Sequence, residues 1–221
     1  NPQADDGFGT SVAIDGDTVV IGAPAEDGGA TGVNGDQTSN AAVDSGAAYV
    51  FVRLGTHWTQ RAYLKASNTA AGHVFGLSVA VSGDTVVVGA YREDGSATGV
   101  NGAQRHYAVP TAGAAYVFVR NAGVWSQQAY LKASNTEADD WFGSAVAVSG
   151  DTVVVGANGD DSFKGSAYVF VKPAGGWTGT LNESAKLLAS DGAAFDRFSS
   201  SVAIAGDTVV VSAAGDDSSK G

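Results

Sequence analysis

The stretch that decides the fold is Ser11-Val12-Ala13-Ile14-Asp15-Gly16-Asp17-Thr18-Val19-Val20-Ile21-Gly22-Ala23. Two runs rich in Val and Ile flank a Gly-Asp pair, a pattern typical of two antiparallel strands joined by a tight hairpin turn. Nearly the same stretch returns at 78–90, 145–157 and 201–213. Repetition of this kind indicates a fold built from copies of one structural unit.

Two further blocks repeat in the same order. Gly-Ala-Ala-Tyr-Val-Phe-Val stands at 46–52 and returns, with small changes, at 113–119 and 165–171, while Ala-Tyr-Leu-Lys-Ala-Ser-Asn stands at 62–68 and 129–135 and returns loosely at 185–190. We expect the first block to form a third strand, because β-branched and aromatic residues favour strands. We expect the second to be a half-exposed outer strand, because apolar residues alternate with polar ones. No stretch predicts a helix, so the fold class is all-β, with β-propeller blades of four antiparallel strands.

The repeats divide one domain, residues 1–221, into units. Three are complete, at 5–68, 72–135 and 139–190, and a half unit at 195–221 lacks strands three and four. An incomplete blade leaves a strand edge open. Three alternatives follow: the chain is a segment of a longer repeat chain, copies of the chain complete the blade by head-to-tail strand addition, or a small ring closes around an incomplete blade.

Composition narrows the function. The chain has 31 Gly, no Cys and a formal net charge of −11. Without Cys there are no disulfides, thiol nucleophiles or thiolate zinc sites. The acidic balance argues against nucleic acid as a partner. No apolar run approaches the ~18 residues of a membrane span, so membrane insertion is not expected.

Short motifs at the ends of the hairpins carry a family resemblance. Phe8-Gly9, Phe75-Gly76 and Phe142-Gly143 precede the first strand of a unit, and Gly22-Ala23-Pro24 ends a second strand. Together they resemble the FG-GAP repeat of integrin α-subunit propellers and of many bacterial surface proteins. The resemblance implies a β-propeller, an extracellular or cell-surface location, and a bacterial source. The half unit departs from the motif with Phe198-Ser199 and Ser212-Ala213-Ala214.

Acidic residues gather in the connections from strand two to three and from strand four to one, which a propeller places on one face. Carboxylate and carbonyl oxygens suit calcium. The candidate metal ligands are Glu26, Asp27, Asn34, Asp36, Glu93, Asp94, Asn101, Asp139, Asp140, Asp160, Asp161, Asp216 and Asp217. The alternative is that the acids only keep a Gly-rich protein soluble. The calcium loop of the resembling family lies between strands one and two, where this chain has only the short Asp15-Gly16-Asp17 turn, so any metal site must lie elsewhere.

Insertions and tryptophans offer two further candidates for binding. Residues 26–45 and 93–112 share the sequence Ala-Thr-Gly-Val-Asn-Gly, which predicts a repeated Ω-like loop with a small core around Val33 and Val100, or a binding loop. Trp58, Trp125 and Trp177 precede the fourth strands and either pack at the rim or stack on sugars.

The acid pairs recur from unit to unit, whereas catalysis needs a unique constellation, so we expect no enzyme. The sequence favours an extracellular structural or adhesive repeat protein, self-assembling, even filamentous, or part of a longer surface chain. Its expected partners are copies of itself or adjacent repeats, with glycans or surface proteins in addition. The alternative is a calcium-dependent or carbohydrate-binding propeller module.

Overall fold

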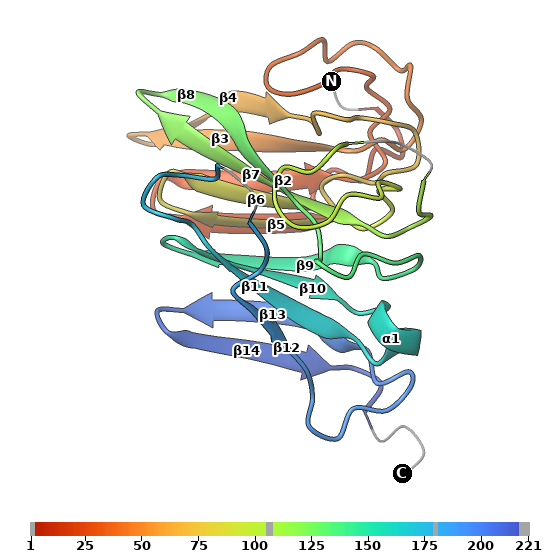
Figure 1. Ribbon diagram of the computed structural model, residues 1–221. Coiled ribbons are helices and arrows are strands. Elements are labelled where there is room, and N and C mark those ends of the chain that lie inside the picture. The colour runs from red at the N-terminus through yellow and green to blue at the C-terminus, as the bar shows by residue number, and fades with distance from the viewer. Residues whose placement is uncertain (1–2, 105–107, 179–180, 217–221) are drawn as a thin grey trace.

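Residues 3–104, 108–178 and 181–216 are described by a computed structural model, and they form four antiparallel sheets in succession along the chain (Figure 1). Blade 1 consists of β1 (Ser11–Asp15), β2 (Thr18–Ala23), β3 (Ala47–Leu54) and β4 (His57–Leu64). Blade 2 consists of β5 (Ser78–Ser82), β6 (Thr85–Ala90), β7 (Ala114–Asn121) and β8 (Val124–Leu131). Blade 3 consists of β9 (Phe142–Ser149), β10 (Thr152–Ala157), β11 (Ser166–Val171) and β12 (Ala185–Leu187).

The last sheet is a half blade of two strands, β13 (Phe198–Ala205) and β14 (Thr208–Ala213). The prediction of three four-stranded blades and a half blade is therefore confirmed. One short helix, α1 (Asp160–Phe163), was not expected, and the left-handed φ angles of Asp161 and Ser162 make it an irregular turn. No helix among the described residues is long and apolar enough to cross a membrane.

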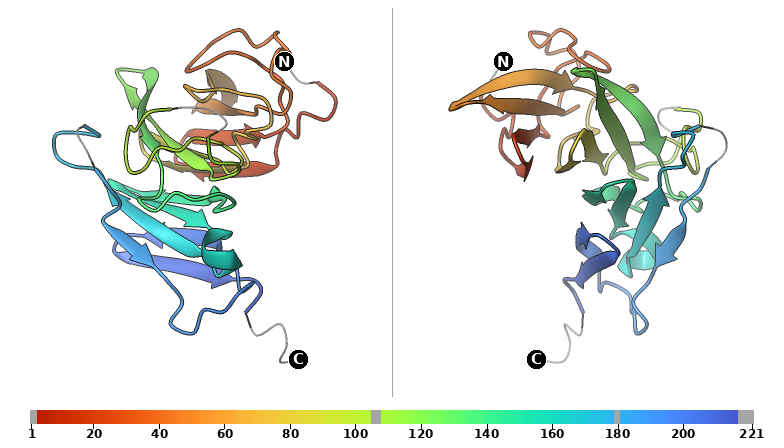
Figure 2. Two further views of the ribbon diagram at one scale, coloured as in Figure 1. Left: turned by 45° about the vertical axis from the view of Figure 1, so that its right-hand side comes forward. Right: turned by 90° about the vertical axis from the view of Figure 1, so that its left-hand side faces the viewer.

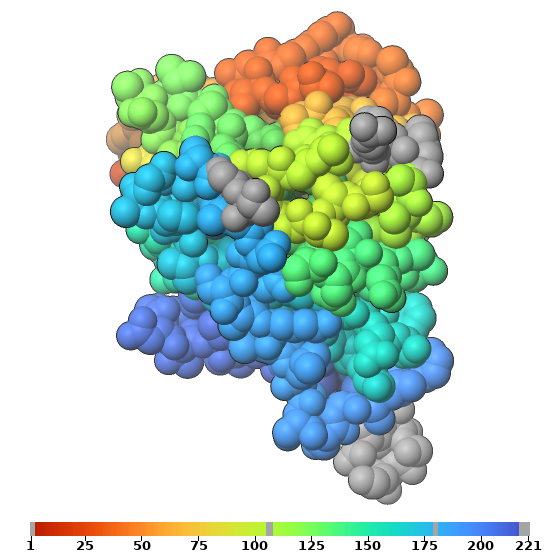
Figure 3. Space-filling model, viewed as in Figure 1, coloured from red at the N-terminus to blue at the C-terminus, as the bar shows by residue number. Residues whose placement is uncertain are grey.

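The blades follow one another in an arc, with blade 1 and the half blade at its two ends (Figure 2). The space-filling view shows the units stacked in the order of the chain, from blade 1 to the half blade (Figure 3). The first strand of each later blade packs against the first two strands of the blade before it. Each blade therefore has a leading face, which meets the preceding blade, and a trailing face, which meets the following one.

The Gly-Asp pairs close the inner hairpins, as the sequence predicts. Asp15 pairs with Thr18, which leaves a loop of two residues. The glycine of this loop has φ between 54° and 57° in all four sheets, at Gly16, Gly83, Gly150 and Gly206. Two-residue hairpin loops need positive φ at this position, and glycine adopts it without steric cost.

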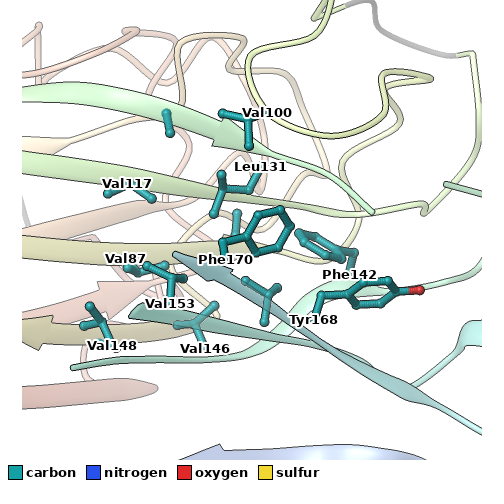
Figure 4. Close-up of a cluster of buried hydrophobic side chains, with 14 of the residues drawn as sticks. Val87, Val100, Val117, Leu131, Phe142, Val146, Val148, Val153, Tyr168 and Phe170 are labelled. Atoms are coloured by element: carbon teal, nitrogen blue, oxygen red, sulfur yellow. The ribbon is translucent and has the colours of Figure 1, made fainter. Parts of the chain in front are cut away.

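Aromatic residues of the third strand form the core between blades. Phe142, Tyr168 and Phe170 on the leading face of blade 3 pack against Val117 and Leu131 on the trailing face of blade 2 (Figure 4). All five side chains are at most 1% exposed. The inter-blade core that alternating aromatics predict is thus present, and each blade completes the core of its neighbour.

The Phe-Gly and Gly-Ala motifs meet at these junctions. The carbonyl of Gly76 in blade 2 accepts a hydrogen bond from Ser11 Oγ of blade 1 at 2.7 Å. A Cβ atom added to Gly22 would lie 1.9 Å from the same carbonyl oxygen. Glycine is therefore required at position 22 because the next blade approaches too closely for any side chain.

The fourth strand β4 is exposed over its first five residues, but the stretch 62–66, which the sequence predicts to be half-exposed, is buried. Its last residues, Tyr63 and Leu64, and the following Lys65 are completely buried. The insertion 26–45 covers them, because Val33 forms a β-bridge with Leu64 and the amide of Lys65 donates to the carbonyl of Gly32 at 2.8 Å. The insertion packs on its own blade's outer edge and does not form an independent small core.

Candidate functional site

The acidic loop of blade 1 holds a buried ion pair. Glu26 is 1% exposed, and its Oε2 accepts a hydrogen bond from Lys65 Nζ at 2.8 Å. Its Oε1 accepts a second bond from the hydroxyl of Tyr63 at 2.7 Å. Lys65 Nζ also donates to Ser45 Oγ at 2.8 Å. The carboxylate of Glu26 is therefore neutralised by a lysine of the same blade.

Blade 2 repeats the buried glutamate–lysine pair and adds a residue from blade 1. Glu93 Oε2 accepts from Lys132 Nζ at 3.0 Å, with both side chains fully buried. Its Oε1 accepts from the amide of Asn68 at 2.8 Å. The carbonyl oxygen of that amide accepts from the hydroxyl of Tyr116 at 2.6 Å. Asn68 follows the last strand of blade 1, so it joins the two blades by buried polar contacts.

Blade 3 reaches the same charge balance with a lysine in a different place. Asp160 Oδ2 accepts from Lys186 Nζ at 2.7 Å and from the hydroxyl of Tyr168 at 2.6 Å. Lys186 occupies the position of Tyr63 in blade 1, and Leu188 takes the position of Lys65. Asn135 of blade 2 reaches this site too, accepting from Tyr168 at 2.8 Å. In all three blades a lysine therefore pairs with the acid, although in blade 3 the lysine comes from a different position of the repeat.

Most of the other predicted ligands hold the loops in shape. They accept hydrogen bonds from nearby groups as follows: Asp27 from the amide of Asp44, Asp36 from Thr38, Asp94 from the amide of Thr111, Asn34 from the amide of Tyr63, Asn101 from the amide of Tyr130, Asp139 from Thr111, Asp140 from the amide of Glu137, and Asp161 from Lys164. Asp216 is exposed, and Asp217 lies outside the described residues.

Burial sets the protonation of these clusters. It lowers the pKa of Lys65 and of Lys132, and the paired glutamates oppose this shift. Burial also raises the pKa of Asp140 to about 7, helped by the carboxylates of Asp160 and Glu137 and opposed by the amide of Glu137. Burial alone would raise the pKa of Asp160, but hydrogen bonds, first among them that from Lys186, hold it below its usual value.

The predicted metal ligands do not converge on one point. Among the described residues, no three side chains of His, Cys, Asp or Glu come close enough together to hold a metal ion. Glu26, Glu93 and Asp160 each already have a lysine ammonium within 3.0 Å. A calcium ion would have to displace that lysine, so calcium binding stays a prediction for which the described side chains offer no assembled site.

The most distinctive surface is the leading face of blade 1. Phe8, Val19, Ile21, Phe51 and Trp58 line an open hollow of about 450 Å³ there. Phe8 is 51% exposed and Trp58 is 43% exposed. Such a cluster of exposed aromatic and aliphatic side chains is typical of an interaction surface.

The same positions are buried in the next two blades. Their counterparts are Phe75, Val86, Val88, Phe118 and Trp125 in blade 2, and Phe142, Val153, Val155, Phe170 and Trp177 in blade 3, and all ten are at most 6% exposed. Trp125 and Trp177 therefore pack at the rim between blades, as one of the two interpretations of the sequence expects. Only the tryptophan of blade 1 is left open.

The lysines of the buried pairs were missed by reasoning from the sequence, although the sequence carries a signal for two of them. Lys65 lies 39 residues after Glu26, and Lys132 lies 39 residues after Glu93. A lysine at a constant distance from a repeated acid, at the end of an apolar strand, indicates a paired charge. Lys186 breaks this spacing, so no pattern within the repeat would have found it.

Comparison with protein families gives a match along most of the chain. The family model described as FG-GAP repeat matches residues 1–51, 58–118, 125–170 and 181–221. No curated protein matches the chain.

Proposed function

The chain belongs to the FG-GAP repeat family, and we propose that it is a non-catalytic structural or adhesive module of an extracellular or cell-surface protein, whose open leading face packs against a further blade of the same kind. Repeats of this family usually occur in extracellular or surface proteins. The observation that carries the proposal is that five positions buried in blades 2 and 3 are exposed or only partly buried in blade 1.

A complete blade is the occupant that fits this face. At the junction of blades 1 and 2, the covering side chains include Val20 of strand two, Val50 of strand three and Leu64 of strand four. In the part of the half blade that the structure describes, only the two strands β13 and β14 serve this purpose. An adjacent repeat with four strands would therefore cover the leading face of blade 1 more fully than the half blade of a second copy.

The serine that replaces the junction glycine in the half blade also disfavours head-to-tail packing of copies. A Cβ at Gly22 or Gly89 would lie 1.9 or 2.0 Å from a carbonyl oxygen of the following blade. Ser212 occupies the equivalent position in the half blade, and its Oγ accepts from the amide of Ser201 at 3.0 Å. A following blade at the usual spacing would collide with this side chain. Assembly of copies into filaments is accordingly the less favoured form of the proposal.

Polar groups at the leading face of blade 1 also indicate that a further blade covers it. Tyr116 and Tyr168 bond to an asparagine supplied by the preceding blade, at 2.6 and 2.8 Å. Tyr49 holds the equivalent position in blade 1 and is 4% exposed. Burial raises the pKa of Tyr49, and the nearby charge of Glu26 raises it further. An asparagine of a preceding blade would complete this cluster as it does in blades 2 and 3.

An added blade tests the proposal. A copy of residues 5–71 placed before the chain would present its own Val20, Val50 and Leu64 to the open face. We expect the melting temperature to rise and the fluorescence of Trp58 to shift to shorter wavelength, because its ring would leave water. The matched control carries Gly22→Val in the added copy only, which blocks close approach. Equal melting temperatures and Trp58 emission for the two extended chains would contradict the proposal.

A further inference from the structure

Four aromatic rings from the connections between strands form a continuous run. Figure 1 shows on its right the face where these connections and α1 lie. Tyr91 lies 6.0 Å from Trp141 between ring centroids, Trp141 lies 4.9 Å from Phe163, and Phe163 stacks on Phe195 at 5.8 Å. Tyr91 directly follows β6 of blade 2, and Phe195 precedes β13 of the half blade. The run therefore crosses blade 3 from one neighbour to the other.

The fold does not require aromatic residues at these places. Trp141 has a φ of 58°, and the equivalent residue of blade 1 is Gly7, with a φ of 68°. Phe195 has a φ of 73°, and the equivalent residue of blade 2 is Gly72, with a φ of 79°. Large side chains at positive φ are strained, whereas glycine is not. Other units also carry non-glycine residues with positive φ here, Val74 and Arg197 at the first position and Asp5 and Asp139 at the second. The backbone conformation therefore belongs to the repeat, and what is particular to Trp141 and Phe195 is the aromatic ring.

A groove opens between the first two rings of the run. It has a volume of about 650 Å³, and Tyr91 and Trp141 provide its aromatic walls. Arg92, Thr111, Asp139 and Asn158 provide its polar groups. The size and the mixture of aromatic walls with a few polar groups are those of a small-molecule site.

One of the residues that line the groove has a buried oxygen without a hydrogen-bond donor in the described part of the chain. The Oδ1 atom of Asn158 is buried and has no hydrogen-bond partner among the described residues. Buried acceptors are rarely left without a donor. Because this oxygen is buried beneath the groove surface, a ligand hydroxyl would donate to it only if the Asn158 side chain turned towards the groove.

Charge decides between classes of ligand. The Arg92 guanidinium lies 5.3 Å from the centre of the Tyr91 ring, and the Arg197 guanidinium lies 5.8 Å from that of Phe163. These two cations repel a positively charged ligand from the aromatic surfaces. The carboxylate of Asp139 in the groove and that of Asp161 on α1 repel a polyanion. A neutral ligand with many hydroxyl groups meets neither penalty.

We propose that this groove and the ring run bind a neutral oligosaccharide. The C–H groups of a sugar ring pack against the electron-rich face of an aromatic ring, while its hydroxyl groups bond to amide, carboxylate and guanidinium groups. One sugar residue occupies the groove between Tyr91 and Trp141, and further residues extend along Phe163 to Phe195. This site is independent of the leading face of blade 1, which lies on another blade.

The test is an array of oligosaccharides followed by calorimetry with the shortest one bound. The array carries neutral oligomers of glucose, mannose, galactose and N-acetylglucosamine, together with sialylated and sulfated ones. We expect binding to neutral oligomers and about tenfold or greater loss of affinity in Trp141→Gly, as for removal of an aromatic anchor. Because Gly7 shows that glycine suits this backbone position, Trp141→Gly should fold normally, and its melting temperature checks this.

Two further variants keep the proposal falsifiable. Val124→Ala removes an exposed apolar side chain outside the groove and should leave binding unchanged. Phe195→Gly should weaken binding of long oligomers and spare short ones. If Trp141→Gly does not fold, Tyr91→Ala replaces it, with the same expected loss. Absence of binding to neutral oligomers at millimolar concentration, preference for charged ones, or retention of affinity in a folded groove variant would overturn the proposal.

Discussion

The leading faces of blades 1 and 2 have nearly the same sequence and opposite environments. Phe118 and Trp125 of blade 2 are 0% and 4% exposed, whereas their counterparts Phe51 and Trp58 line the open hollow of blade 1. The strands that carry them have the same bounds relative to the repeat. The difference lies wholly in what stands in front of the face: blade 1 covers blade 2, and no described residue covers blade 1.

This contrast shows that each blade has two apolar faces, and that each face needs a neighbouring blade to bury it. The stability of such arrays is approximately a sum of the intrinsic stability of each unit and the interface terms between adjacent units. Equivalent substitutions in blades 1 and 2 should therefore differ by the interface term alone. Two pairs of variants compare blades 1 and 2 in this way, and two more compare equivalent junction positions in other units. They are given from the largest expected effect to the smallest.

Truncation of the core phenylalanine should separate the two faces most strongly. Phe118→Ala leaves a cavity between two blades and should lower the free energy of unfolding by about 3–5 kcal/mol. Phe51→Ala removes a ring from a partly open surface and should cost about 1 kcal/mol or less. Urea denaturation of both variants checks this. Equal costs would mean that the face of blade 1 is already covered in solution.

The junction glycine should give the next largest difference. Gly89→Ala places a Cβ 2.0 Å from the carbonyl oxygen of Gly143 and should cost about 1–3 kcal/mol through overpacking. Ser212→Gly, at the equivalent position of the half blade, relieves no contact with a following blade and should change stability by about 1 kcal/mol or less. Thermal unfolding compares them, and a Gly89→Ala variant as stable as the unmodified chain would refute the close approach.

The tyrosine hydroxyls should distinguish the polar contacts at the two faces. Tyr116→Phe removes a donor to Asn68 and should cost about 1–2 kcal/mol, because the carbonyl oxygen of the asparagine is left buried. Tyr49→Phe removes the equivalent hydroxyl where no preceding blade among the described residues supplies an asparagine, and should be nearly neutral. A double variant with Asn68→Ala checks that the cost in blade 2 belongs to this pair.

The free energy of unfolding should depend on pH through Asp140, a buried acid at the junction of two blades. Because the pKa of Asp140 is raised to about 7, the folded chain holds this proton more tightly than the unfolded chain does. The contribution of Asp140 to the free energy of unfolding should therefore increase as the pH falls through 7 towards the ordinary carboxyl range. Asp140→Asn should remove this slope. Asp6→Asn, at the equivalent position of blade 1, is the control and should leave the slope in place.

The sequence predicts the architecture well because short segments of each repeat specify its turns and strands. Gly16 and its counterparts specify hairpins, and the alternating Tyr49 and Phe51 specify an inner strand. The sequence does not predict that Lys65 is buried, because the covering insertion comes from residues far away in the chain. It also gives Phe51 and Phe118 equivalent surroundings, since exposure depends on a neighbouring blade rather than on the residue's own segment.

The candidate sites were predictable only in part. Repeated acids identify the loops in which Glu26 and Glu93 lie, but not the lysines that neutralise them. Tyr91, Trp141, Phe163 and Phe195 come from four different connections and share no motif, so only the folded chain brings their rings together. Three of them stand where other units carry Gly7, Asn158 or Gly72, and that departure from the repeat is the only trace in the sequence.

One measurement tests the central claim most directly: the cost of Phe51→Ala in the chain extended by a copy of residues 5–71. If the leading face of blade 1 is built to receive a blade, this cost should rise from about 1 kcal/mol or less to the 3–5 kcal/mol of a buried phenylalanine, approaching that of Phe118→Ala. A cost that stays the same with and without the added blade would contradict the claim.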